Sequence, residues 1–135
     1  MALTGPNSSV YNSRGPITTR MVTVAAGQTI HYGELVMIGS DGLGYACAAL
    51  ASNRGIVGIC TTPGSTAAGG RIEVASGEFR LPATSGAQNM VQTEVFGQAN
   101  STVGATAANL PIAGIVTEFE SASWLWLRVG PDARI

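Results

Sequence analysis

Apolar and polar residues alternate over short stretches along most of the chain, and glycine-containing turns separate these stretches. Alternation with a period of two, in runs of four to eight residues, is typical of β-strands, so the pattern predicts about nine short strands. The expected strand positions are 18–24, 34–38, 45–48, 56–62, 71–74 with 78–81, 91–96, 101–103, 112–119 and 123–129. No stretch keeps the helical period of 3.6 over three turns, and glycines, serines and threonines interrupt the nearest one, 97–109. We therefore expect an all-β fold, a small β-barrel or β-sandwich with almost no helix.

Two local signals refine this expectation. Ser40-Asp41-Gly42 lies between two strand candidates and predicts a hairpin turn. The apolar residues fall on even positions in 71–74 and on odd positions in 78–81. One face of a regular strand cannot change parity, so a bulge or turn is expected at Ser76-Gly77.

The first seventeen residues differ from the rest, because they are polar and contain Gly-Pro and Asn-Ser pairs that favour loops. Such a segment cannot form its own core. It is either a frayed terminus or an extended N-terminal arm, 1–17, that becomes ordered against a neighbouring subunit with Tyr11 and Arg14 as anchors. A single all-β domain would then occupy 18–135.

The last strand candidate carries bulky residues on both faces. In one interpretation Leu125, Leu127 and Val129 line the core, and Trp124, Trp126 and Arg128 point the other way. In the alternative, the tryptophans face inward and the leucines outward. Tryptophan and arginine are enriched at interface hot spots, so a partner or a packed arm is expected over this strand. The candidate contacts with a partner or with another subunit are Tyr11, Arg14, Arg20, Trp124, Trp126 and Arg134.

The 135 residues suffice for one domain with a real core, since 45% of them are hydrophobic. Only 11% are charged and the net charge is -1, which argues against direct nucleic-acid binding and leaves an unusually neutral surface that favours association. All seven basic residues are arginine. Either codon bias or use at interfaces explains this, and in both cases no lysine-dependent chemistry is possible.

Candidate catalytic chemistry is sparse. His31 is the single histidine and lies in what reads as a polar turn, so a surface or hydrogen-bonded structural role is expected. Glu118 and Glu120 share a face of one strand and resemble the carboxylate pair of glycosidases, but solvent-facing glutamates on an edge strand explain them as well. Cys47 and Cys60 lie in apolar runs and are expected to be buried free thiols, with a disulfide as the alternative. We expect no catalytic residue, no metal and no cofactor.

Neither a membrane span nor a secretion signal is expected, because no apolar run approaches 18 residues and the first residues lack a basic region followed by an apolar one. Synthesis in the cytoplasm is the expectation that follows.

The order of several segments between 28 and 129 resembles the small head decoration, or capsid cement, proteins of tailed phages. These segments are Gly33-Glu34-Leu35-Val36, Gly55-Ile56-Val57-Gly58-Ile59, Ala68-Gly69-Gly70-Arg71-Ile72-Glu73-Val74, Gly77-Glu78-Phe79-Arg80-Leu81-Pro82, Ile112-Ala113-Gly114-Ile115-Val116 and the closing Leu127-Arg128-Val129. The longer N-terminal segment and the two tryptophans of the last strand depart from what is expected of that family.

The resemblance implies a small β-barrel or sandwich that binds the outer surface of the expanded head and bridges neighbouring major capsid proteins, often as a dimer or trimer. It implies no catalytic residues, a virion location and synthesis in the host bacterial cytoplasm. The alternative is a carbohydrate- or host-surface-binding β-module of a virion, with Trp124 and Trp126 as stacking platforms for sugars. A third interpretation is an enzyme that acts on polysaccharide through Glu118 and Glu120.

Overall fold

The computed structural model describes residues 13–50, 52–98 and 101–130, and this part of the chain is almost entirely β-structure. One turn of 3-10 helix, η2 (Gln88–Met90), is the only helical element among the described residues. The strands are β1 (Ser13–Thr23), β2 (Thr29–His31), β3 (Leu35–Ile38), β4 (Gly44–Ala46), β5 (Ile56–Cys60), β6 (Ser65–Ala67), β7 (Arg71–Pro82), β8 (Glu94–Gly97), β9 (Val103–Gly104), β10 (Ile112–Ser121) and β11 (Trp124–Val129). The expected all-β class with almost no helix is confirmed.

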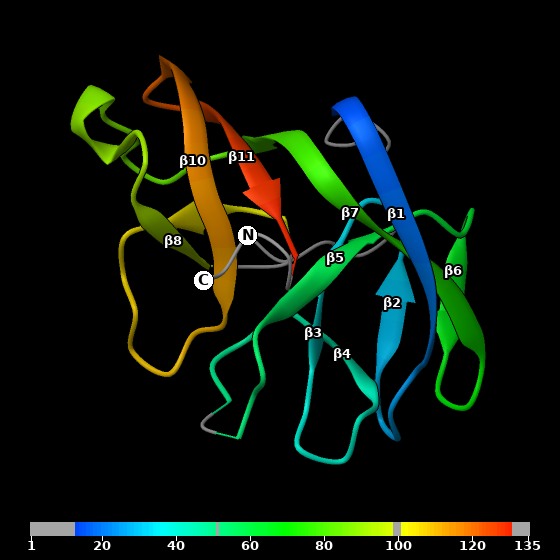
Figure 1. Ribbon diagram of the computed structural model, residues 1–135. Helices are drawn as coiled ribbons and strands as arrows, with labels where there is room; N and C mark the ends of the chain where they lie inside the picture. Colours follow the sequence, from blue (N-terminus) through cyan, green and yellow to red (C-terminus); the bar gives the residue numbers. More distant parts are fainter. Residues whose placement is uncertain (1–12, 51, 99–100, 131–135) are drawn as a thin grey trace.

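Nine of these strands form one antiparallel sheet that curls into a half-barrel (Figure 1). The strand order is β4-β3-β5-β7-β11-β10-β8-β9, and β1 pairs with β7 beside that path. The two remaining strands, β2 and β6, form a small separate ribbon. The sequence did not indicate these two strands: His31 was expected in a turn and instead lies in β2, opposite Ser65 of β6.

The expected hairpin around residue 41 is present. Strands β3 and β4 pair antiparallel, with Ile38 opposite Gly44, and Gly42 has a φ of +80°. A positive φ at this point of the turn requires a residue without a Cβ, which is why the Asp-Gly pair was a reliable signal.

The longest strand, β7, separates two hydrophobic clusters. Ile72 and Val74 belong to the smaller cluster, whereas Phe79 and Leu81 belong to the larger one. The even positions face one cluster and the odd positions face the other, from opposite sides of one continuous strand. The expected bulge or turn within this strand is therefore wrong, because Gly77 to Pro82 keep a regular register with β11. Gly77 marks the transition, with a φ of +154°, and a Cβ there would lie 2.9 Å from the carbonyl oxygen of Pro16.

The irregularity opposite Ser76-Gly77 lies in the neighbouring strand β1. Arg14 pairs with Glu78 and Thr18 pairs with Ser76. Strand β1 thus uses four residue steps where β7 uses two, and the additional residues form a bulge in β1. Residues 13–17, which the sequence assigned to the arm, thus form the start of β1 and are held by their own β7. Residues 1–12 lie outside the described residues.

Both cysteines are buried and free, as expected. Cys47 belongs to the larger hydrophobic cluster and Cys60 to the smaller one. A disulfide between them would have to join two cores that β7 separates, so the alternative does not apply.

Candidate functional site

The side chains of β11 divide between its two faces as the first interpretation of this strand predicted. Leu125, Leu127 and Val129 are buried in the larger cluster. Trp124 and Trp126 are half-buried on the opposite face. The alternative, with the tryptophans in the core, is wrong. The leucines share their face with the cluster that also holds Phe79, whereas each indole lies against an arginine on the other face.

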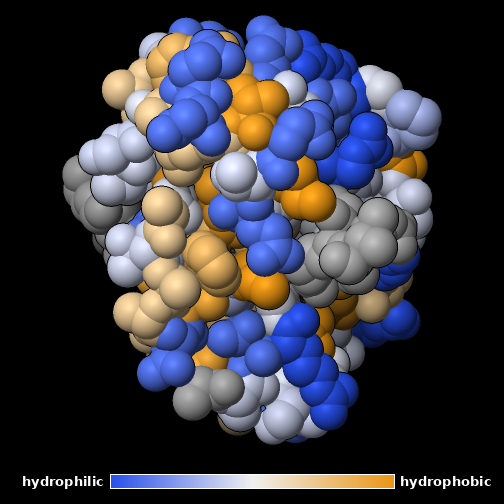
Figure 2. Space-filling view, turned by 60° about the vertical axis from the view of Figure 1, so that its left-hand side comes forward, coloured by the Kyte–Doolittle hydropathy of each residue, from blue (hydrophilic) through white to orange (hydrophobic). Residues whose placement is uncertain are grey.

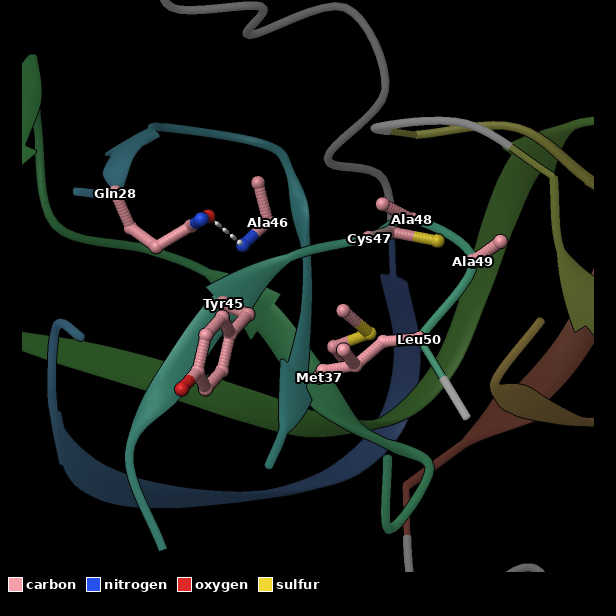
Figure 3. A pocket seen from close by; sticks show the side chains of 8 residues that line it. All are labelled: Gln28, Met37, Tyr45, Ala46, Cys47, Ala48, Ala49 and Leu50. Carbon is pink, nitrogen blue, oxygen red and sulfur yellow. Dashed lines mark hydrogen bonds between the residues drawn. The ribbon is translucent and has the colours of Figure 1, made fainter. Parts of the chain in front are cut away.

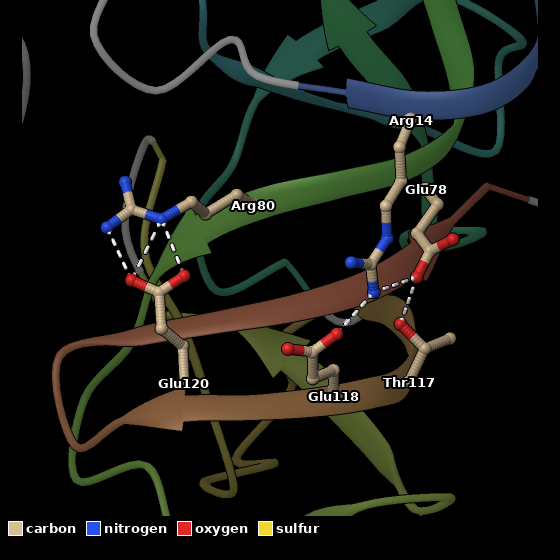
Figure 4. Close-up of polar contacts among 6 residues, drawn as sticks. All are labelled: Arg14, Glu78, Arg80, Thr117, Glu118 and Glu120. Atoms are coloured by element: carbon tan, nitrogen blue, oxygen red, sulfur yellow. Dashed lines mark hydrogen bonds and ion pairs between the residues drawn. The ribbon is translucent and has the colours of Figure 1, made fainter.

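Neighbouring strands place charged residues on the same outward face. Trp126 lies opposite Arg80 of β7 on one side and opposite Glu118 of β10 on the other. Strand β1 brings Arg14 beside Glu78. We call the surface formed by Arg14, Glu78, Arg80, Glu118, Glu120, Trp124 and Trp126 the Arg-Trp face, and Figure 4 shows its polar contacts.

One half of the Arg-Trp face is built around Arg14. Its guanidinium carbon lies 4.0 Å from the ring centroid of Trp126. Its Nη2 donates to Glu78 Oε2 and to Glu118 Oε1, each at 2.8 Å. Glu78 also accepts a hydrogen bond from the hydroxyl of Thr117. Arg14 of β1 therefore links β7 and β10 through its ion pairs, and it does so while it stacks on Trp126 of β11.

Arg80 organises the other half. Its guanidinium carbon lies 3.9 Å from the ring centroid of Trp124. It also binds Glu120 in a bidentate manner, with Nε 2.9 Å from Oε1 and Nη2 2.6 Å from Oε2. Two parallel N–H···O bonds fix both the position and the orientation of the planar guanidinium. Each tryptophan of the chain thus lies under an arginine that a glutamate holds in place.

The ion pairs stabilise the charged forms of the carboxylates. The hydrogen bond from Arg14 holds the pKa of Glu78 below its usual value, and the hydrogen bond from Arg80 does the same for the pKa of Glu120. A glycosidase acid needs the opposite shift, because it must hold its proton near neutral pH. Glu118 is bound to Arg14, so neither glutamate of the expected pair is an unpaired acid or base. Strand β10 is also an internal strand between β11 and β8, not the edge strand considered above.

Of the other expected contact residues, Arg20 is described by the structure and does not join this face. Arg20 donates a hydrogen bond from Nη1 to Ser76 Oγ at 3.1 Å, on the part of β1 beyond its irregularity. Tyr11 and Arg134 lie outside the described residues. Arg14, expected as an anchor for a neighbouring subunit, binds its own chain, because the pairing of Ser13 and Arg14 with β7 brings it over Trp126.

His31 has a structural environment. Its Nδ1 lies 2.5 Å from Ser65 Oγ, across the β2-β6 ribbon. The fully buried Glu34 accepts a hydrogen bond from the backbone N–H of His31, at 2.6 Å, and not from the ring. No carboxylate among the described contacts orients the imidazole, so the arrangement lacks the third member of a catalytic triad.

A shallow pocket of about 400 Å³ lies beside β4 (Figure 3). Its lining is mostly apolar and consists of Gln28, Met37, Tyr45, Ala46, Cys47, Ala48, Ala49 and Leu50. The one reactive side-chain type in it is the thiol of Cys47, and burial raises the pKa of that thiol to about 12. A thiol that stays protonated is a poor nucleophile, so Cys47 is not activated for nucleophilic attack.

Two further features are absent from the described residues. No group of three or more histidine, cysteine or acidic side chains gathers there at metal-binding distance. No helix in the described ranges is long and apolar enough to cross a membrane.

Sequence reasoning missed Glu78 and Arg80. The signal was available, because both occupy the polar positions of the alternating stretch 78–81. Their partners, however, come from strands about 40 and 64 positions away, as the pairs Arg80–Glu120 and Arg14–Glu78 show. Alternation tells which residues share a face and does not tell which strand will lie beside them.

The fold and this face together define a small all-β protein with a structured, charge-balanced aromatic surface. No family model matches the chain, and no curated protein matches it in sequence.

Proposed function

We propose that this chain is a structural virion protein, a capsid decoration or cement subunit that binds the outer surface of an expanded phage head and stabilises the joints between major capsid proteins. Copies of itself, as a dimer or trimer, are the second partner, and the protein is made in the host bacterial cytoplasm. The resemblance of the segment order to decoration proteins supports the proposal, as does the low content of charged residues.

The observation that carries the proposal is the Arg-Trp face. Tryptophan and arginine are the side chains that dominate binding energy at protein interfaces. Here both tryptophans and two arginines are already locked by stacking and ion pairs, so little side-chain entropy remains to be lost on binding. A surface ordered before binding suits a protein whose task is to hold other proteins together.

The proposed work is mechanical. An interface of roughly 1,600 Å² is enough for specific association, and several simultaneous contacts on a lattice add avidity. Apolar and hydrophilic residues are interspersed on the face seen in Figure 2. Such a mixture is expected of a surface that associates without a strong electrostatic field of one sign.

The carbohydrate-binding alternative fits this face less well. Stacking of a sugar needs an open ring face, and a guanidinium already covers one face of each indole, at 4.0 Å for Trp126 and 3.9 Å for Trp124. We therefore treat it as an outcome of the test.

The test measures how much purified protein loads onto expanded and unexpanded empty heads. The chain should load onto expanded heads alone. Trp126→Ala should weaken loading at least about tenfold, as truncation of a hot-spot residue does. Arg71→Ala, at an exposed arginine of β7 outside the Arg-Trp face, is the matched control and should load normally.

Failure to bind either kind of head would overturn the proposal, and glycan binding by the same protein would then favour the carbohydrate-binding module. Deletion of residues 1–12 tests the arm separately, because it leaves β1 and Arg14 in place. Unchanged loading after this deletion would remove the arm from the proposal.

A further inference from the structure

Strand β1 is a long strand with one partner. It has eleven residues and pairs with β7, and no other described strand pairs with it. Residues 14–19 are all exposed. The free side of such a strand presents unpaired backbone N–H and C=O groups, which is a template for pairing with another chain.

The backbone hydrogen bonds show which residues of β1 face that free side. At the end of the strand, Val24 donates its N–H to Gly70 and accepts from Gly69, on the side of β7. Backbone groups alternate between the two sides of a strand, so Thr19 and Met21 direct theirs away from β7. Ile17 directly precedes Thr18, where the regular pairing with β7 begins.

The same segment carries both exposed large hydrophobic side chains of the described residues. Ile17 is 37% exposed and Met21 is 52% exposed. They lie two positions before and two positions after Thr19. An antiparallel pair of identical strands centred on Thr19 would therefore place each of them opposite the other.

We propose that two copies of this chain associate through β1 in an antiparallel pair centred on Thr19. Ile17 then lies opposite Met21 of the second copy, and Thr18 lies opposite Arg20 of the second copy. Directly opposed residues of an antiparallel pair are on the same side of the sheet, so both apolar pairs remove exposed surface from water.

Neighbouring registers are less favourable. A pair centred on Arg20 would set the two Arg20 side chains directly opposite each other, and like charges in that position are destabilising. A pair centred on Thr18 would place Met21 opposite Gly15, which offers no side chain. The register centred on Thr19 is the one that joins the hydrophobic residues and separates the arginines.

Pairing would join two half-barrels into one continuous sheet and would cover the longest free strand edge that the described residues present. The inference does not depend on the shell proposal, because it rests on the edge of β1 and not on the Arg-Trp face. A dimer that ignores phage heads would refute the shell proposal and leave this one standing.

The first experiment is light scattering over a range of concentrations. The chain should show twice the 13.7 kDa mass of one copy. Met21→Lys puts an ammonium against Ile17 of the second copy but beside Glu73 of its own β7, so the fold should tolerate it while the dimer dissociation constant rises at least about tenfold. Gln88→Lys, at an exposed residue of η2 with the same change of charge, is the matched control.

The second experiment tests the register. Thr19→Cys places two thiols across the twofold axis, where paired Cα atoms lie about 5.5 Å apart, within disulfide range. Mild oxidation should yield a covalent dimer, while Thr84→Cys, at an exposed threonine outside β1, should not. The native cysteines are buried and give no background. A monomer at all concentrations, or a dimer that Met21→Lys leaves intact and Thr19→Cys does not cross-link, would overturn the proposal.

Discussion

Leu127 and Trp126 are neighbours in the chain and have opposite environments. Leu127 is fully buried in the larger cluster, whereas Trp126 lies half-buried under Arg14. The two positions show how a period of two translates into structure: adjacent side chains of one strand serve the core and the outer face in turn.

Leu127→Ala should destabilise the protein by about 2–5 kcal/mol, since it leaves a cavity that the surrounding sheet cannot fill. Trp126→Ala should cost less, because the ring is only half-buried and its removal leaves no enclosed cavity. Urea unfolding of both variants measures the difference. An equal or larger loss for Trp126→Ala would show that the outer face contributes as much to stability as the core.

The sequence alone divided these residues between two faces and left open which face is buried. The fate of Arg14 could not be predicted in the same way. It was expected to bind a neighbouring subunit, and it binds Glu78, 64 positions along the same chain. The polar composition of the first residues gave no indication that Ser13 and Arg14 continue β1.

At the scale of elements, the Arg-Trp face depends on four strands held in register. Arg14 comes from β1, Glu78 and Arg80 from β7, the tryptophans from β11, and the remaining glutamates from β10. An irregularity of β10 between Val116 and Glu118 turns Thr117 toward Glu78, so the bulge contributes directly to the network.

The network should make stability depend on acid pH. The folded pKa of Glu78 lies below its unfolded value, near 4.5, so the folded state binds this proton less readily than the unfolded chain does. The stabilisation is therefore present above about pH 4.5 and is lost as the pH falls through the folded pKa. Urea unfolding of the wild type and Glu78→Gln should differ at pH 7 and should differ less at a pH below about 4.5.

Glu94→Gln, at an exposed glutamate of β8 outside the network, is the control and should leave stability nearly unchanged at both pH values. A difference between the wild type and Glu78→Gln that persists unchanged at low pH would show that packing, and not the charge of Glu78, is responsible.

The stacking of Arg14 on Trp126 and of Arg80 on Trp124 should also limit the access of solvent to the two rings. Arg14→Ala exposes the ring of Trp126 and Arg80→Ala exposes that of Trp124, so acrylamide should quench the fluorescence of each variant more strongly than that of the wild type. Arg71→Ala leaves both stacks intact and serves as the control. Quenching that does not change in either variant would mean that the guanidiniums do not cover the rings in solution.

At the scale of the whole molecule, the dominant feature is pairing between distant segments. Strand β1 pairs with β7, and β7 pairs in turn with β11, so the centre of the sheet joins the beginning, middle and end of the described chain. Such a topology closes long loops before its contacts form, which slows folding.

Refolding should therefore take roughly milliseconds to seconds, the range of all-β domains, when followed by tryptophan fluorescence after dilution from urea. The tryptophans are a suitable probe because both lie on β11, next to β7 and β10. Refolding within microseconds would contradict the topology described above, since only local contacts form that fast.

What the sequence by itself determined about this protein is local: the all-β class, the hairpin at Asp41-Gly42, the two faces of β11 and the change of parity near Gly77. Each follows from side-chain alternation or turn chemistry within a few residues. Only the tertiary structure decided which strands are neighbours. It paired the short strands β2 and β6, whose three residues each are too few to show a period, and it brought Arg14 and Arg80 over the tryptophans. The physical reason is that strand pairing is stabilised by contacts between residues tens of positions apart, and alternation within one strand carries no information about its partner.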